Sequence, residues 1–238
     1  MTTEHIVTSY EDELAGLDKK IALMGGLTEK LVGQAADALR YRDADLAQAT
    51  IEDDVKIDEL EIEIEEQAIS MIARRQPMAL DLRQIMAAVK ITSDLERIGD
   101  LGKNIAKRTL SVHLEKQPTQ LVHGMKNMQE LALAQLKDVL DAYTERNTEK
   151  ALSVWHRDEE IDAIYNSLFR ELLTYMMEDP RNISLCTHLL FCAKNLERIG
   201  DHTTNIAETI HFLVQGTTIN KERPKGDETP QMIMDQQS

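Results

Sequence analysis

The sequence is poor in the residues that build β-sheets, tight turns and disulfide frameworks. Only 4% of its 238 residues are aromatic, and it holds 10 glycines, 5 prolines and 2 cysteines. Sheets favour aromatic and β-branched side chains, whereas the Leu, Ala, Glu, Gln and Lys that are plentiful here favour helices. Cys186 and Cys192 form neither a Cys-x-x-Cys motif nor a disulfide framework, so we predict that both are small core residues.

The chain also lacks long apolar runs and an excess of positive charge. No apolar stretch approaches the roughly 20 residues that span a bilayer, and the N-terminal segment has neither a basic start nor an apolar core. We therefore expect a cytoplasmic protein without membrane insertion. The formal net charge of −15 opposes nucleic-acid binding, because that affinity comes largely from Lys and Arg displacing counterions from phosphates. Cations, or basic surfaces of other proteins, are the expected partners.

Apolar residues recur three and four positions apart through most of the chain, which is typical of amphipathic helices. Asp43 is the expected cap after the first break, and Asn147 or Thr148 the expected cap after the corresponding later break. The spacing predicts six helices. The first runs from 14 to a break at 42–45, the second from that break to the residue before Pro77, and the third from about 82 to before Pro118. The fourth runs from 125 to a break near 144–147, the fifth from that break to Asp179-Pro180, and the sixth from there to Gly216.

The sequence contains an internal repeat. Residues 95–100, Leu-Glu-Arg-Ile-Gly-Asp, recur at 196–201, and Asn-Ile-Ala follows each copy at the same offset of 101. Three residues of another segment, Asp54, Ile57 and Asp58, align with Asp158, Ile161 and Asp162 at an offset of 104. We predict an all-α fold, a tandem repeat of two three-helix bundles, each with a modest core of its own. Residues 1–116 form the first repeat, 117–216 the second, and 217–238 a disordered polar tail.

Four pairs of acidic residues stand at matching places in the two repeats. Residues four apart share one face of a helix, and a helical wheel places the pair after Leu95 opposite the apolar stripe. We therefore expect these carboxylates on a groove or surface, where hard cations such as Mg²⁺, Mn²⁺ or Ca²⁺, or iron, would suit them. A solvated acidic face is the competing interpretation. The pairs are Glu96 with Asp100, Glu197 with Asp201, Asp54 with Asp58, and Asp158 with Asp162.

Two further patterns bear on the function class. Glu208-x-x-His211 matches the Glu-x-x-His of ferritin-like di-iron helices, but the first repeat has Lys107 and Leu110 there. A ferritin-like di-iron oxidase or metal-storage bundle is thus the alternative function, and a purely structural dimerisation module is a third. The sequence offers no nucleophile arrangement or Gly-rich phosphate loop, so we predict that the protein is not an enzyme.

The doubled Leu-Glu-Arg-Ile-Gly-Asp with its Asn-Ile-Ala continuation resembles the PhoU family of phosphate-uptake regulators, over about residues 13 to 215. The resemblance implies two three-helix bundles related by pseudo-twofold symmetry. It also implies metal ions, with Mg, Mn, Fe and Zn all open, bound by Glu96 with Asp100 and Glu197 with Asp201, facing Asp54 with Asp58 and Asp158 with Asp162.

The same resemblance implies a regulatory adaptor in a bacterial cytoplasm. Such a protein dampens the phosphate-starvation response and phosphate uptake through contacts with a phosphate sensor histidine kinase and a phosphate ABC transporter ATPase subunit at the inner membrane. An elongated amphipathic bundle also favours a homodimer. The second repeat continues to Glu208 where the first has Lys107, so the two metal sites would differ if an acidic residue there takes part.

Overall fold

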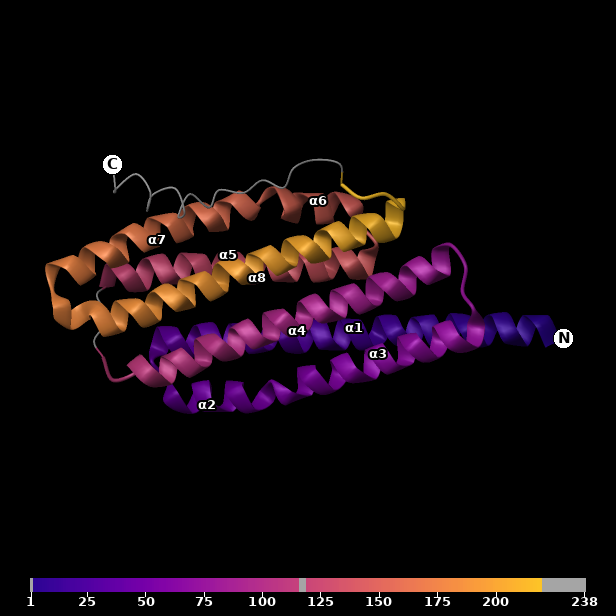
Figure 1. Ribbon diagram of the computed structural model, residues 1–238, viewed down its shortest axis with the longest axis horizontal. Helices are drawn as coiled ribbons and strands as arrows, with labels where there is room; N and C mark the ends of the chain where they lie inside the picture. The colour runs from indigo at the N-terminus through magenta and orange to yellow at the C-terminus, as the bar shows by residue number, and fades with distance from the viewer. Residues whose placement is uncertain (1, 116–118, 220–238) are drawn as a thin grey trace.

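The computed structural model describes residues 2–115 and 119–219, and these residues are helical almost throughout (Figure 1). The first repeat contains α1 (Thr2–Tyr41), α2 (Ala44–Asp53), α3 (Val55–Arg75) and α4 (Leu80–Val112). The second contains α5 (Thr119–Glu145), α6 (Thr148–His156), α7 (Asp158–Glu178), the 3-10 turn η1 (Pro180–Asn182) and α8 (Ile183–Gln215). The predicted all-α tandem repeat is confirmed. In each repeat the middle predicted helix corresponds to two consecutive helices, α2 and α3 in the first and α6 and α7 in the second.

The helix ends follow the local chemistry that the sequence indicated. The Asp43 side chain accepts a hydrogen bond from the Leu46 amide at 2.9 Å and caps α2. Asn147 accepts one from the Lys150 amide at 3.0 Å and caps α6. Gly216 ends α8 in the left-handed region, at φ 76°, which glycine adopts without steric cost. These predicted boundaries are confirmed.

The middle helix of each repeat is interrupted, although we predicted it as continuous. Asp54 separates α2 from α3, and Arg157, at φ −87° and ψ 2°, separates α6 from α7. The apolar period passes through both interruptions unchanged, which is why the sequence did not reveal them. At the second one, the buried Gln135 side chain donates to the Arg157 carbonyl at 2.8 Å, and the same carbonyl accepts from the Glu160 amide at 3.1 Å.

The two repeats share one hydrophobic core. In Figure 1, α4 and α8 lie at the centre in opposite directions, with α3 and α7 on the outer sides and α1 and α5 behind. α4 packs more extensively on α8 than on any helix of its own repeat. The buried apolar side chains of all eight α-helices therefore form one continuous cluster, and the expectation of two separate cores is wrong. Both cysteines are buried in this core, as predicted.

Two expectations concern the surface and the end of the chain. Among the described residues, no helix is long and apolar enough to span a membrane. Of the predicted polar tail at 217–238, residues 220–238 lie outside the described residues. Ile219, by contrast, is partly buried and packs against the core, so the part of the predicted tail nearest to Gly216 is not simply solvated.

Candidate functional site

The first acidic cluster consists of Asp54, Asp58, Glu96 and Asp100. Asp54 lies in the interruption between α2 and α3, and its side chain is only 4% exposed. Lys103, one turn beyond Asp100 on α4, places its ammonium group between the two segments. It forms ion pairs with a carboxylate oxygen of Asp54 and with Oδ1 of Asp100, the latter at 2.7 Å. A lysine thus joins the two acidic helices of the first repeat.

The proton affinities of the first acidic cluster reflect crowding of negative charge. Burial, followed by the charge of Asp100, raises the pKa of Glu96 to about 7. Burial and the neighbouring Asp54 also raise the pKa of Asp58. Burial alone would raise the pKa of Asp100 as well, but the hydrogen bond and positive charge of Lys103 outweigh it, and that pKa is lowered. Lys103 therefore keeps the carboxylate that it contacts ionised.

The second acidic cluster consists of Asp158, Asp162, Glu197 and Asp201. Asp158 opens α7 directly after the second interruption, and Asp162 follows one turn later. Glu197 and Asp201 stand on α8. Burial is the main cause that raises the pKa of Glu197; the hydrogen bond and charge of Lys194 oppose it, and the charges of Asp201 and Asp162 add to it. The carboxylates of the two helices are therefore close enough to repel one another.

The polar contacts of the second acidic cluster differ from those of the first. Lys194 lies 2.8 Å from Oε1 of Glu197, within the same helix. The other oxygen of Glu197, Oε2, is buried and has no hydrogen-bond partner, although the side chain is only 6% exposed. Thr204 donates its hydroxyl to Oδ1 of Asp158 at 3.1 Å. A neutral hydroxyl here occupies the position that Lys103 holds in the first repeat.

The carboxylates are less exposed than the helical wheel indicated. Asp54, Asp158, Asp162 and Glu197 are buried, whereas Asp58, Glu96 and Asp100 are partly exposed. The wheel placed α4 and α8 correctly against their cores, but it could not include α3 and α7, which cover the same face. The expectation that Glu197 points into a groove or to the surface is therefore wrong, because a neighbouring helix covers that face.

The Glu-x-x-His motif of α8 has other partners. Oε1 of Glu208 accepts a hydrogen bond from the indole nitrogen of Trp155 at 2.9 Å. Nδ1 of His211 lies 3.0 Å from the carbonyl oxygen of Thr217, at the end of the helix. The glutamate therefore fixes α6 against α8 and the histidine contacts the chain after α8. Neither contact corresponds to a di-iron site.

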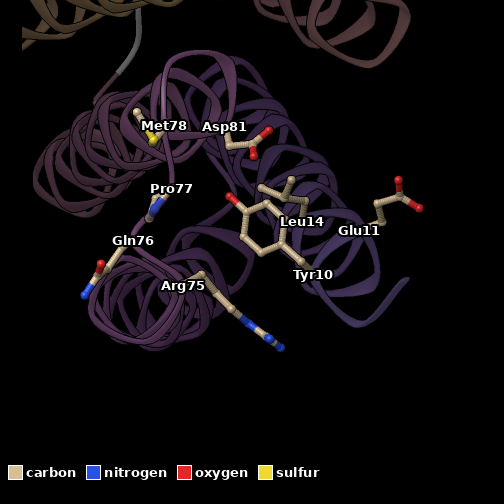
Figure 2. A pocket seen from close by; sticks show the side chains of 8 residues that line it. All are labelled: Tyr10, Glu11, Leu14, Arg75, Gln76, Pro77, Met78 and Asp81. Carbon is tan, nitrogen blue, oxygen red and sulfur yellow. The ribbon is translucent and has the colours of Figure 1, made fainter. Parts of the chain in front are cut away.

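A hollow of about 450 Å³ lies away from both acidic clusters, between the start of α1 and the α3–α4 turn. Figure 2 shows the Tyr10 ring pointing into this space, while Glu11 points away from it. No residue of either acidic cluster lines it. The predicted site residues and this hollow are thus separate features of the molecule.

The sequence model of the PhoU domain matches residues 21–109 and 125–210, which are the two repeats. The chain belongs to the PhoU family. A PhoU homologue from Rhizobium meliloti (strain 1021), described as a phosphate-specific transport system accessory protein, is 57% identical over 229 residues, or 96% of this chain and 97% of the homologue. A protein of the same description from Caulobacter vibrioides (strain NA1000 / CB15N) is 52% identical over 94% of this chain and 98% of its own length.

Solved PhoU structures have the same fold. The crystal structure of PhoU from Pseudomonas aeruginosa superposes with a TM-score of 0.85 at 39% identity, covering 87% of this chain and all of the other. The crystal structure of the phosphate transport system regulatory protein PhoU from Streptococcus pneumoniae superposes with a TM-score of 0.81 at 30% identity, covering 89% of this chain and all of the Streptococcus chain. The resemblance inferred from the doubled motif is confirmed, and all eight predicted ligands lie within the two matched PhoU domains.

The acidic clusters of this PhoU chain contain the oxygen atoms that a cation needs, but their side chains do not lie close enough together to bind one ion. Oδ1 of Asp54 and Oε2 of Glu197 are buried oxygens without hydrogen-bond partners, and such oxygens suit a hard cation. Across residues 2–115 and 119–219, however, no three His, Cys, Asp or Glu side chains stand close enough together to hold a metal ion. A bound ion would have to draw the side chains of either acidic cluster together.

Sequence reasoning missed the two residues that distinguish the clusters. Lys103 and Thr204 correspond at the same offset of 101 that aligns the doubled motif. Comparing residues of unlike type across the repeat, as well as identical ones, would have revealed them. It also missed Asp18, which accepts hydrogen bonds from Tyr143 of the second repeat at 2.5 Å and from Gln84 at 3.1 Å.

Proposed function

We propose that this protein is a cytoplasmic accessory protein of a phosphate transport system and that it negatively regulates phosphate uptake and the phosphate-starvation response. The observation that carries the proposal is the near full-length similarity to relatives described as phosphate-specific transport system accessory proteins, at 57% identity for the first. Both PhoU domains are present, and the helices of the two domains share one hydrophobic core. A helical body with one shared core suits regulation by contact with partner proteins.

A reporter strain tests the regulatory role. In bacteria that lack their own gene for this protein, an alkaline phosphatase reporter driven by a phosphate-starvation promoter should be active even when phosphate is plentiful. Expression of this chain should restore repression, and phosphate uptake should fall with it. Repression that does not return, although the chain is present and folded, would contradict the proposal.

Cation binding by the acidic clusters is the second part of the proposal. Two carboxylate-rich sites, each with one buried oxygen that has no hydrogen-bond partner, support it, because such oxygens suit a hard cation. Mg²⁺, Mn²⁺ and iron suit oxygen ligands, and zinc is the least suited, because neither cluster contains His or Cys. Elemental analysis of protein purified without chelator or affinity metal should find such an ion. A metal-free preparation would contradict this part alone.

A stripe of exposed apolar residues on α3 supports contact with another protein. Val55, Ile62 and Ile69 are spaced seven apart, so they share one helix face, and they are between 52% and 67% exposed. Exposed glutamates surround them, including Glu59 and Glu66. Two such acidic faces would repel each other, so the stripe suits a basic amphipathic helix of a partner protein rather than a second copy of α3.

The proposed partners are the phosphate sensor histidine kinase and the ATPase subunit of the phosphate ABC transporter. Binding of the purified cytoplasmic part of each to this chain can be measured directly. The double substitution I62N/I69N should weaken binding of the partner that contacts α3, the kinase or the ATPase subunit, about ten-fold or more. L173N, at the second-repeat position corresponding to Ile69, is the matched control and should leave it unchanged. Equal binding by all variants would exclude the stripe but not the partners.

A homodimer is also proposed, because an elongated helical body exposes long lateral surfaces. Light scattering during size-exclusion chromatography measures the mass in solution. A mass of twice that of the chain supports the dimer, and the monomer mass at working concentration contradicts it.

A further inference from the structure

The surface on which α4 and α8 lie side by side concentrates positive charge, although the chain has a formal net charge of −15. Arg83, Lys90 and Arg108 share one face of α4, because steps of seven and eighteen residues are close to two and five full turns. Arg198 is exposed on α8. None of these four residues, which we call the basic ridge, forms an ion pair with a carboxylate among the described residues.

Aromatic rings of α8 hold three of these cations in place. The guanidinium carbon of Arg108 lies 4.0 Å from the centre of the Phe191 ring. Arg83 and Lys90 lie 5.6 and 5.9 Å from the centre of the Phe212 ring. The face of a ring attracts a cation but leaves the N–H donors at the edge of a guanidinium group without acceptors. The basic ridge is therefore positioned, and its donors remain available to carboxylates of another molecule.

The acidic residues beside the basic ridge are occupied by other partners. Asp94 of α4 lies 2.8 Å from Nδ1 of His202 and accepts a hydrogen bond from Asn205 at 3.3 Å, so it joins α4 to α8. Asp100 is bound by Lys103 on the side of α4 toward the α2–α3 interruption. Neither carboxylate neutralises the basic ridge.

Exposed apolar side chains accompany the cations. Met86 lies three residues after Arg83 and four before Lys90, on the same helix face, and is 43% exposed. Phe191, beside Arg108, is 48% exposed. Basic and apolar groups thus follow one line along α4, which spans about 37 Å from Arg83 to Arg108 at a rise of about 1.5 Å per residue.

The helices on either side of the basic ridge carry the opposite charge. In Figure 1, α3 and α7 lie on the outer sides of α4 and α8. Their exposed residues include Glu63 and Glu66 on α3 and Glu159 and Glu160 on α7. A wide anionic surface, such as a lipid bilayer, would approach these glutamates as well and be repelled by them. The arrangement therefore favours a narrow acidic occupant.

We propose that the basic ridge is a docking surface for an acidic amphipathic helix of a partner protein. Carboxylates seven residues apart on such a helix would meet Arg83 and Lys90, and apolar side chains between them would cover Met86 and Phe191. A linear phosphate polymer is equally narrow, but it would leave these apolar side chains exposed to water.

The basic ridge differs in charge from the apolar stripe of α3. The stripe of α3 suits a basic helix and the basic ridge suits an acidic one, so one chain can hold two partners of opposite charge at the same time. The proposal does not depend on regulation of phosphate uptake, which the reporter strain tests separately.

Synthetic helices measure the chemistry that the basic ridge selects. The acidic probe is a labelled peptide of about 25 residues with a stripe of Leu flanked by Glu, and the neutral probe has Gln in place of Glu. Fluorescence anisotropy with the full-length chain should show about ten-fold tighter binding of the acidic probe. This binding should weaken several-fold as NaCl rises from about 50 to about 300 mM. Equal binding of the two probes would overturn the proposal.

Substitutions locate the binding of the acidic probe. R83Q/K90Q/R108Q should weaken it about ten-fold or more. Circular dichroism checks that this variant is folded. If it unfolds, K90Q/R198Q replaces it, because both of those side chains are exposed, and should weaken binding about three-fold or more.

A matched variant controls for net charge. K19Q/K30Q/K137Q removes three exposed lysines of α1 and α5, so it has the same net charge as R83Q/K90Q/R108Q and should bind like the wild type. An equal loss in the two variants would mean that overall charge alone attracts the probe, and would overturn the proposal.

A photoreactive residue in place of Ser93, an exposed position of α4, identifies the occupant in cells. We expect a crosslink to a protein segment that mass spectrometry shows to be acidic and amphipathic, and we expect R83Q/K90Q/R108Q to abolish it. A crosslink to lipid, to a phosphate polymer, to a second copy of this chain or to a segment without that pattern would overturn the proposal, as would the absence of any crosslink.

Discussion

Burial controls the chemistry of the two thiols, which are the simplest single-residue test of the structure. Burial raises the pKa of Cys192 to about 12, and burial, aided by the charge of Glu115, also raises the pKa of Cys186. Because the thiolate is the reactive form, neither cysteine should react with an aromatic disulfide reagent at about pH 8 in the native protein. Both should react in denaturant. Rapid labelling of one thiol in the native state would mean that α8 opens there.

Tyr143 contributes stability through a hydrogen bond between the repeats. Its hydroxyl donates to Asp18 Oδ1 at 2.5 Å, and Arg146 lies 2.7 Å from the other oxygen of that carboxylate. Tyr143→Phe should lower the free energy of unfolding by about 1.5 to 3 kcal/mol, as is usual for a lost bond to a charged group. Urea denaturation measures this. Tyr41→Phe removes a hydroxyl from an exposed ring and should leave the midpoint unchanged; equal midpoints for both variants would contradict the role of Tyr143.

Two glycines, Gly99 and Gly200, let neighbouring helices pack closely together. A Cβ on Gly200 would lie 2.7 Å from Cδ1 of Ile161, a buried residue of α7, and one on Gly99 would lie 3.1 Å from the same atom of Ile57. Gly200→Ala should therefore destabilise the protein by about 1 to 3 kcal/mol through overpacking.

Gly26 provides the matched control within a helix. Nothing lies within 4 Å of a Cβ built there, so Gly26→Ala should gain helix propensity and stabilise by about 0.5 to 1 kcal/mol. Thermal denaturation distinguishes the two changes by sign. A similar loss for both variants would show that crowding at the α7–α8 contact is not the reason for Gly200.

The continuous core makes a prediction about the whole molecule. Because apolar contacts run from α1 through α4 and α8 to α7, neither repeat can lose its packing without exposing the other. The chain should therefore unfold in a single calorimetric transition whose measured enthalpy equals the van't Hoff enthalpy. Two resolved transitions would show that the repeats behave as independent domains.

Much of the fold could be predicted because its signals are local. The apolar period, the capping residues Asp43 and Asn147, and the prolines that follow α3 and α7 all act within a few residues of the feature they specify. The duplication was visible for the same reason, since matching motifs need no knowledge of packing. The interruptions at Asp54 and Arg157 escaped because they leave the period intact, and the Gln135 side chain that bonds the Arg157 carbonyl comes from another helix.

The sequence by itself determined that this protein is helical and duplicated, that it belongs to the PhoU family, and which eight carboxylates occupy matching places. Only the tertiary structure decided what surrounds those carboxylates. Lys103 reaches Asp54 across 49 positions of sequence, and the face of Glu197 that the wheel left open lies under a neighbouring helix. Periodicity describes one helix against its core, whereas burial and ion pairing depend on which other helix covers the remaining face.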